Sequence, residues 1–440
     1  MKITKTLAPL LAVTAVYAFS NDAAASAKTK HMPVAATAAS NDTKSARETT
    51  RAETKHLADA TTAASDSTST RSNPSTDMPD WTVVELASTI NPRVLTGSDG
   101  VTNLVYELVV TNFGLNNVPL KSFQVYGDTT TEKPLLTLDS KGIAGVLQSS
   151  AKPKIGSNLA PGAVAILFVN IDLGIDGKAP DKLIQKLTYE YKDKKKVEDK
   201  TTTYETTVDK TRPIIVGAPL SGKGWLATGG YVNSGHRRSL FPLNNTLKCA
   251  QRFAIDWLRL DDQNRIVSGD KKLVESFSGY GKPVFAVADA TVYGVVDKFE
   301  NQPPYKASGS MEHPGGNTIT LKISDNAYGF YAHLKPGSIK VKEGDRVKKG
   351  QMIASLGNVG NTDGPHLHFH ITESPDVLGS NGIPYAFEQF DLSGETAEAE
   401  FMKNFYSGGI LKIDKATQPG THKNQLPKEG NVVSFPELAN

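Results

Sequence analysis

Hydrophobic and polar positions alternate over short runs in the chain from residue 81 onward. The runs are rich in β-branched and aromatic residues and are separated by turn sequences such as Asn91-Pro92 and Pro161-Gly162. A period of two places neighbouring side chains on opposite faces of a sheet, so these runs predict strands. The expected strands cover 82–87, 104–111, 123–126, 135–138, 164–171, 186–191 and 201–208. Short strands at this spacing are typical of an antiparallel sandwich, and we predict an Ig-like β-sandwich over 81–212.

A second alternating run contains three of the nine histidines, in the sequence Gly-Pro-His-Leu-His-Phe-His-Ile at 364–371. The period of two places His366, His368 and His370 on one strand face and the intervening apolar residues on the other. Neighbouring imidazoles on such a face lie about 6.6 Å apart and the outer two about 13 Å apart. Zinc binds nitrogen at about 2.0–2.1 Å, so one ion cannot be held by both ends of the row. A row of exposed strand histidines is the alternative interpretation.

The ends of the chain show different patterns. Lys2 and Lys5 precede an apolar stretch at 7–19 and then small residues, which predicts a signal peptide over 1–25 and export. Between 21 and 80, 33 of 60 residues are Ala, Ser or Thr and none is aromatic, so we predict a disordered tether over 26–80. After residue 392 Pro, Gly, Lys and Asn predominate, and 393–440 is predicted to be a C-terminal strap or tail.

Composition narrows the classes of function. A chain of 440 residues is long enough for two or three domains. The 49 Lys and Arg residues nearly balance 46 Asp and Glu residues, and a net charge of +3 argues against a nucleic-acid partner. The single cysteine, Cys249, excludes an internal disulfide and a Cys-rich zinc site. Any metal site must therefore use histidines and carboxylates.

An ordered set of motifs carries a resemblance to a known family. The motifs are Gly-Asn-Thr-Ile-Thr-Leu at 316–321, Tyr-Ala-His-Leu at 331–334, Gly-Asp-Arg-Val-Lys-Lys-Gly-Gln at 344–351, Leu-Gly-Asn-Val-Gly at 356–360 and Gly-Pro-His-Leu-His-Phe at 364–369. The region at about 230–392 resembles the lysostaphin-type (LytM-type) zinc endopeptidases of peptidoglycan. The resemblance implies an antiparallel β-sheet groove of duplicated-hybrid-motif type, which we assign to 213–392. The whole chain is then mainly β.

The resemblance also implies roles for individual residues. Asp256 and His368 would be ligands of Zn²⁺, His366 the base that orients and deprotonates water, and His333 the partner of the oxyanion. These roles agree with the chemistry of zinc, which lowers the pKa of bound water to about 7.

The sequence departs from the family pattern four residues before Asp256, where Arg252 replaces the usual first ligand histidine. A guanidinium about 4 Å from a divalent cation would be repelled by roughly 8 kcal/mol at an effective dielectric constant of 20. The resemblance extends to exported relatives with a Gly-His-Arg-Arg segment, present here at 235–238, so His236 is the candidate replacement ligand. A surface-loop histidine is the equal alternative. Strand alternation would place Arg252 on the face of Asp256 and direct it outward into a substrate groove. His370 is a further candidate, either as a residue that supports a ligand from behind or as a groove residue.

We therefore predict an exported zinc metallo-endopeptidase that hydrolyses peptide cross-links of peptidoglycan, located in the periplasm, cell wall or extracellular space. Peptidoglycan peptides are the expected partners, no membrane span is expected after signal cleavage, and the sandwich is expected to cover or extend the groove. The alternative is a degenerate, metal-free LytM-type domain that binds wall peptide or regulates another wall hydrolase.

Overall fold

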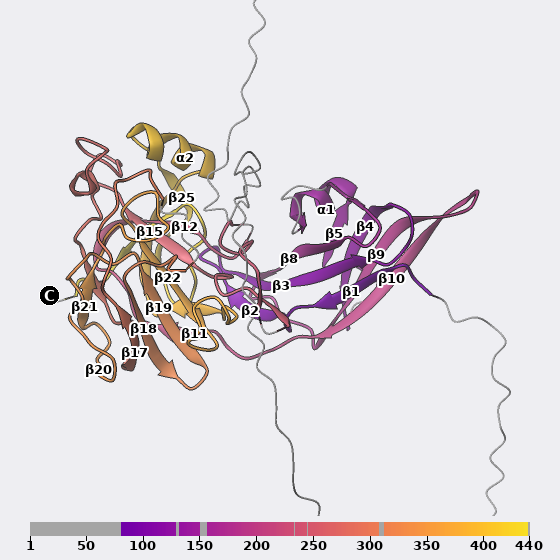
Figure 1. Cartoon of the computed structure of the whole chain (residues 1–440), viewed down its shortest axis with the longest axis horizontal. Helices are drawn as coiled ribbons and strands as arrows, with labels where there is room; N and C mark the ends of the chain where they lie inside the picture. The colour runs from indigo at the N-terminus through magenta and orange to yellow at the C-terminus, as the bar shows by residue number, and fades with distance from the viewer. Residues whose placement is uncertain are drawn as a thin grey trace, which may run out of the picture. The chain divides into compact units, whose positions relative to one another are not determined.

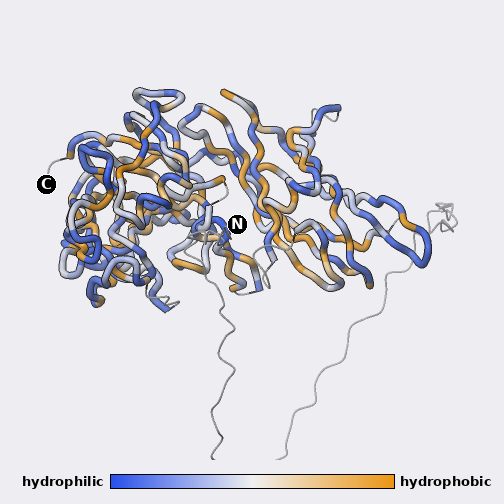
Figure 2. Tube along the Cα trace, turned by 90° about the horizontal axis from the view of Figure 1, so that it is seen from above, coloured by the Kyte–Doolittle hydropathy of each residue, from blue (hydrophilic) through white to orange (hydrophobic). Residues whose placement is uncertain are grey.

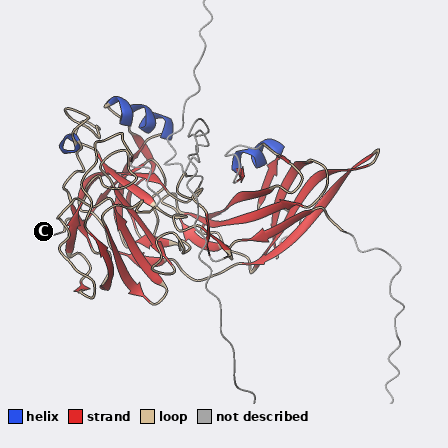
Figure 3. Cartoon of the chain, in the orientation of Figure 1, coloured by secondary structure: helices blue, strands red, loops and turns tan. Residues whose placement is uncertain are grey.

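A computed structural model describes residues 81–128, 132–149, 156–232, 234–243, 245–307 and 312–438 (Figure 1). The predicted signal peptide and tether at 1–80 lie outside the described residues. Strands predominate over helices, which confirms the mainly β prediction (Figure 3). Among the described residues, no helix has the length and apolar character that a membrane span requires.

The first part of the described chain forms two five-stranded antiparallel sheets. One sheet has the order β1-β3-β8-β6, with β2 paired to β3. Its strands are β1 (Val84–Ser88), β2 (Arg93–Thr96), β3 (Val101–Asn112), β6 (Leu147–Ser149) and β8 (Val164–Ile175). The other sheet has the order β10-β9-β4-β5, with β7 paired to β4. Its strands are β4 (Val118–Gly127), β5 (Leu136–Asp139), β7 (Asn158–Leu159), β9 (Lys182–Asp193) and β10 (Lys196–Thr207), and the helix α1 (Ser140–Val146) follows β5.

Both sheets contribute to one apolar core, as in a sandwich. Leu108 from β3 and Leu167 from β8 join Phe123 from β4 and Leu187 from β9, and all four side chains are fully buried. Each of the seven predicted strands overlaps an observed one, because a half-buried strand shows a period of two in its sequence. The Ig-like connectivity stays a prediction.

The second part of the chain forms one ten-stranded sheet with the order β20-β17-β18-β19-β22-β15-β12-β26-β24-β25. Its strands are β12 (Gly222–Gly229), β15 (Ile255–Arg259), β17 (Ala290–Val296), β18 (Thr318–Ser324), β19 (Ala327–Ala332), β20 (Arg346–Val347), β22 (Leu367–Thr372), β24 (Phe390–Glu395), β25 (Asp414–His422) and β26 (Asn431–Phe435). Three small pairs accompany it: β11 (Ile214–Val216) with β23 (Tyr385–Phe387), β13 (Phe241–Leu243) with β14 (Thr246–Lys248), and β16 (Pro283–Phe285) with β21 (Met352–Ser355). The helices are η1 (Val274–Ser276) and α2 (Glu398–Ser407).

The C-terminal segment is part of this sheet. β26 pairs with β12 on one side and with β24 on the other. Val432, Val433 and Phe435 of β26 are buried, so this strand packs into the core. The predicted boundary at residue 392 falls inside β24, and the segment expected as a strap instead extends the sheet that carries the site.

The core of the ten-stranded sheet also includes residues from the first sheet. Leu95 of β2 and Val105 of β3 are fully buried in the same cluster as Trp257 and Phe369. Because Val105 lies in that cluster, the face of β3 that points away from the sandwich core is covered by the second part of the chain. Hydrophobic and hydrophilic stretches alternate along both parts of the chain (Figure 2).

Candidate functional site

The site is built on three neighbouring strands of the ten-stranded sheet. Asp256 of β15 lies directly opposite His368 of β22, and Ala332, the last residue of β19, lies opposite His368 on the other side. His333 follows β19 immediately, and His366 immediately precedes β22. Strand register therefore brings together residues that are far apart in the sequence.

The carboxylate of Asp256 is the centre of this group. Its Oδ2 lies 3.1 Å from Nε2 of His236, and its Oδ1 lies 2.8 Å from Nδ1 of His368 and 3.3 Å from Nε2 of His366. His236, Asp256 and His368 each offer one potential metal-binding atom, and these three atoms lie within 4.8 Å of one another. These are the three residues predicted as metal ligands, and the structure brings them together.

His236 reaches this group from the loop between β12 and β13. Its ring packs edge-on against His368, with 4.9 Å between ring centroids. The close approach requires glycine at 229, where φ is +81° and a Cβ atom would lie 2.4 Å from Nδ1 of His236. The surface-loop alternative does not describe His236, whose side chain is only 12% exposed.

His333 and His366 present the same ring nitrogen to the backbone. Nδ1 of His366 lies 2.8 Å from the carbonyl of Gly364, and Nδ1 of His333 lies 2.7 Å from the carbonyl of Val359. A carbonyl only accepts hydrogen bonds, so each Nδ1 carries a proton and Nε2 is the nitrogen that gains or loses the second proton. The two rings face each other with centroids 4.6 Å apart.

His370 lies behind His368 and does not line the cleft, so of its two expected positions the structure shows the one behind a candidate ligand and not the one in the groove. Its Nδ1 is 2.9 Å from Nε2 of His368, and it is 1% exposed. Its ring packs against Phe330, with centroids 5.1 Å apart. The strand alternation was predicted correctly, but neighbouring side chains bury this end of the histidine row.

The groove position predicted for Arg252 is wrong. β15 begins at Ile255, so Arg252 lies in the preceding turn, where strand alternation does not apply. The side chain is fully buried and donates hydrogen bonds to Glu107 Oε2 from Nη2 (2.8 Å) and from Nε (3.0 Å). Its Nη1 donates to the carbonyl of Gly382. The guanidinium therefore pairs with a carboxylate of β3, not with Asp256.

Mutual interactions set the protonation of the group. Burial alone would raise the pKa of Asp256, but the positive charges of His236 and His366 outweigh it and hold this pKa well below its usual value. Burial lowers the pKa of His368, and burial together with the charge of His366 holds the pKa of His333 well below its usual value. An ionised carboxylate thus sits among imidazoles that differ in their tendency to take a proton.

The group opens into a cleft of about 360 Å³. All of its described lining residues fall between 228 and 429, so the sandwich does not cover or extend this cleft as expected. Phe401 and Phe405 of α2 and the acidic Glu398 and Glu429 contribute to its wall. Burial, followed by the charge of Glu398, raises the pKa of Glu429 to about 6. Sequence reasoning missed α2, although the helical spacing of Phe401 and Phe405 was the available indication.

Comparisons with known proteins find relatives that match part of this chain. Residues 271–380 match the sequence model of Peptidase family M23, a range that contains His333, His366 and His368 but begins after Asp256. The glycyl-glycine endopeptidase ALE-1 of Staphylococcus capitis is 34% identical over 105 residues, which cover 24% of this chain and 25% of that protein. The peptidoglycan DD-endopeptidase ShyC of Vibrio cholerae is 35% identical over 135 residues, covering 31% and 26%. The chain thus spans about a quarter of the length of these curated relatives.

Parts of two solved structures are also similar to this chain. The catalytic domain of lysostaphin from Staphylococcus simulans is 20% identical with a TM-score of 0.21, covering 36% of this chain and 88% of that chain. A zinc-containing peptidase from Vibrio cholerae is 16% identical with a TM-score of 0.22, covering 65% and 81%.

Proposed function

Because the chain contains a Peptidase family M23 domain, we propose that it is an exported zinc metallo-endopeptidase that hydrolyses peptide cross-links of peptidoglycan. The observation that carries the proposal is the carboxylate of Asp256 in contact with three imidazoles at the base of a cleft. The named activities of ALE-1 and ShyC, both endopeptidases, support the reaction class, and the name of ShyC supports the substrate.

The residues of this group fit a zinc ion. Two imidazoles and one carboxylate match the nitrogen and oxygen donors that zinc takes in catalytic sites, which leave a position open for water or substrate. His236, Asp256 and His368 would hold the ion. In the described part of the chain, the buried Nε2 of His366 makes no hydrogen bond of normal geometry, so this polar atom beside Asp256 is left for a bound water or substrate. When bound, zinc lowers the pKa of a coordinated water and polarises the scissile carbonyl.

His366 and His333 would act in proton transfer beside the ion. The backbone carbonyl of Gly364 holds the proton of His366 on Nδ1, so Nε2 can accept a proton from water. The ring of His333 packs directly against that of His366 and has the same arrangement at Val359. Because its Nδ1–H is already engaged, donation from Nε2 of His333 to a developing oxyanion would require the imidazolium, which the lowered pKa of His333 disfavours.

The test combines metal content with cleavage. The mature chain, purified without added metal, is analysed for zinc and incubated with cross-linked muropeptides, and the products are identified by mass spectrometry. We expect one zinc per chain, and we expect Asp256→Asn to lose both zinc and cleavage. Asp262→Asn, a matched change at an exposed surface position that pairs with Lys223, should change neither.

The metal-free alternative predicts a different result from the same experiment. In a metal-free site Arg252 would be expected to pair with Asp256 in place of the ion, whereas in the structure it pairs with Glu107. A chain without zinc that still binds muropeptides would support that alternative and overturn the proposed function.

A further inference from the structure

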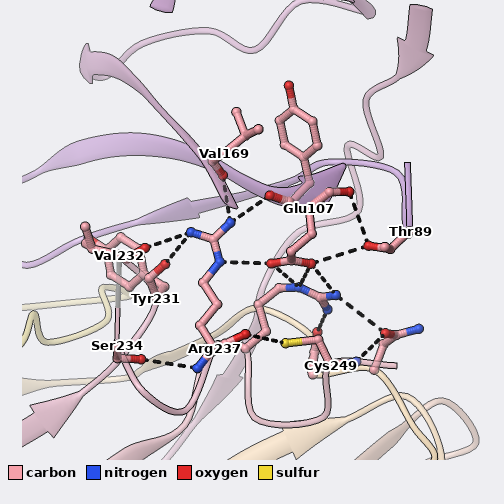
Figure 4. Close-up of polar contacts among 12 residues, drawn as sticks. Thr89, Glu107, Val169, Tyr231, Val232, Ser234, Arg237 and Cys249 are labelled. Carbon is pink, nitrogen blue, oxygen red and sulfur yellow. Dashed lines mark hydrogen bonds and ion pairs between the residues drawn. The ribbon is translucent and has the colours of Figure 1, made fainter. Parts of the chain in front are cut away.

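The candidate ligand His236 is followed directly by two arginines that contact the sandwich. Arg237 is fully buried, and all five of its N–H groups donate hydrogen bonds (Figure 4). Nε donates to Glu107 Oε1 at 2.9 Å, and Nη2 donates to the carbonyls of Tyr106 and Val169 at 2.7 and 2.8 Å. These three acceptors lie on β3 and β8 of the sandwich.

The remaining bonds of Arg237 fix its own loop. Nη1 donates to the carbonyls of Tyr231 and Val232 at 3.1 and 2.8 Å. Sγ of Cys249 lies 3.2 Å from the carbonyl of Arg237. One guanidinium therefore joins both ends of the segment 231–237 to two sandwich strands. His236 lies inside this segment, next to the residue that is held.

Glu107 occupies the face of β3 that points away from the sandwich core. Strand alternation places it with Val105, which is buried in the core of the ten-stranded sheet, while Tyr106 and Leu108 point into the sandwich. Phe168, opposite Glu107 on β8, packs against the guanidinium of Arg238 at 4.9 Å. On the face of this sheet that points away from the sandwich core, Glu107 therefore binds Arg237 and Phe168 packs against Arg238.

The carboxylate of Glu107 also pairs with the second arginine near the site. Arg237 and Arg252 flank it, and all three side chains are 0% exposed. Arg237 follows the candidate ligand His236, and Arg252 precedes the strand that carries Asp256 by a short turn. One sandwich residue therefore connects the two segments that supply two of the three candidate ligands.

We infer that Glu107 is a positioning residue for the metal site: it holds the His236 loop and the turn before Asp256 in the arrangement that binds the ion. The inference rests on the proposed metal site. It makes the sandwich a structural part of that site, although the sandwich does not line the cleft. Glu107 acts on the ligands through Arg237 and Arg252, one residue further out than the groups that hydrogen-bond a ligand directly, whose replacement typically changes metal affinity by about 10- to 100-fold.

The experiment compares Glu107→Gln with Glu85→Gln in the full chain. Both variants remove one carboxylate charge from the same sheet, but Glu85 is exposed on β1. Zinc affinity is measured by competition with a chromogenic chelator, at a temperature where both variants are folded. We expect the zinc dissociation constant to rise about 10- to 100-fold in Glu107→Gln and to stay unchanged in Glu85→Gln. Equal affinity in the two variants would overturn the inference.

Hydrogen exchange separates this inference from the proposed function. In the metal-free chain, amides of 234–239 should exchange faster in Glu107→Gln than in the wild type, since this readout needs no zinc. A wild-type chain that binds no zinc but shows this change contradicts the proposed function while the positioning of the loop stands. Unchanged exchange at 234–239 contradicts the positioning role.

A second variant covers the case in which Glu107→Gln does not fold. Replacement of a buried Arg-Glu-Arg triad by apolar residues of similar volume is often neutral or stabilising. The triple variant Glu107→Leu, Arg237→Met, Arg252→Met leaves no buried charge unpaired, so we expect it to fold. It lacks the hydrogen bonds that hold the His236 loop, and its zinc dissociation constant should also rise at least tenfold. Wild-type zinc affinity in this folded variant would overturn the inference.

Discussion

The four histidines around the cleft differ in the ring nitrogen that faces Asp256 or the cleft. His368 presents Nδ1 to the carboxylate of Asp256, whereas His366 and His333 engage Nδ1 with backbone carbonyls, and His366 presents Nε2 to Asp256. A hydrogen bond from Nδ1 to a backbone carbonyl fixes the orientation of an imidazole that transfers protons. Such a ring keeps its position without a bound metal ion.

Replacing His366 or His333 by Ala should therefore lower turnover by about 100-fold or more and leave zinc bound, since general acid–base groups contribute about 100- to 10,000-fold. His368→Ala should lose zinc. Zinc content by mass spectrometry and turnover on muropeptides measure the two effects separately. Loss of stoichiometric zinc in His366→Ala would make His366 a ligand, in agreement with its 3.3 Å distance from Asp256.

His370 should matter through His368. Its Nδ1 lies 2.9 Å from Nε2 of His368, so it can accept the Nε2–H that His368 carries when its Nδ1 gives up its proton and binds a cation. His370→Ala is expected to weaken zinc binding about 10- to 100-fold, and His370→Gln, which keeps an acceptor, to restore part of the affinity. His313→Ala, a change at a half-exposed turn histidine, is the control. A dissociation constant that does not respond to His370→Ala would rule out this role.

The end of β12 determines how closely the His236 loop can approach the sheet. A Cβ atom at Gly229 would lie 2.4 Å from His236 Nδ1, whereas one at Gly230 would meet no atom within 4 Å. Both glycines have positive φ, +81° and +108°, so alanine introduces backbone strain at either position. The two positions form a matched pair in which only one substitution collides with the candidate ligand.

Gly229→Ala should therefore weaken zinc binding at least tenfold, while Gly230→Ala should lower only thermal stability. Isothermal titration with zinc and thermal unfolding of the metal-free proteins measure the two quantities. Equal zinc affinities would mean that the His236 ring is not needed in its observed place.

At the scale of the whole molecule, the buried Arg237-Glu107-Arg252 group links the sandwich to the second part of the chain. Removing one partner of a buried ion pair leaves a buried charge incompletely compensated, which typically costs about 3–5 kcal/mol. Arg252→Ala should lower the free energy of unfolding by about this amount. Replacing a residue in the substrate groove would instead raise the KM of the reaction and leave stability unchanged. Arg265→Ala, which breaks a partly exposed pair with Asp261, should cost about 1 kcal/mol or less. Urea unfolding measures both, and similar small losses would contradict a structural role for Arg252.

The sequence by itself determined the strands and the chemistry available to the site. A period of two is imposed by the local geometry of each strand, so the sandwich strands and the row at His366, His368 and His370 could be predicted without knowledge of their neighbours. With a single cysteine, Cys249, a metal site had to use histidine and carboxylate donors.

Only the tertiary structure decided which of these residues meet. Glu107 and Arg252 are 145 residues apart in the sequence. No local sequence pattern indicates that a carboxylate on a sandwich strand pairs with an arginine in the turn before β15. The strand alternation that predicted a groove position for Arg252 ends at Ile255, where β15 begins. Likewise, β26 enters the sheet beside β12 through hydrogen bonds to a distant strand, not through its composition. Contacts between distant segments depend on burial and charge pairing in the folded chain, which local periodicity does not encode.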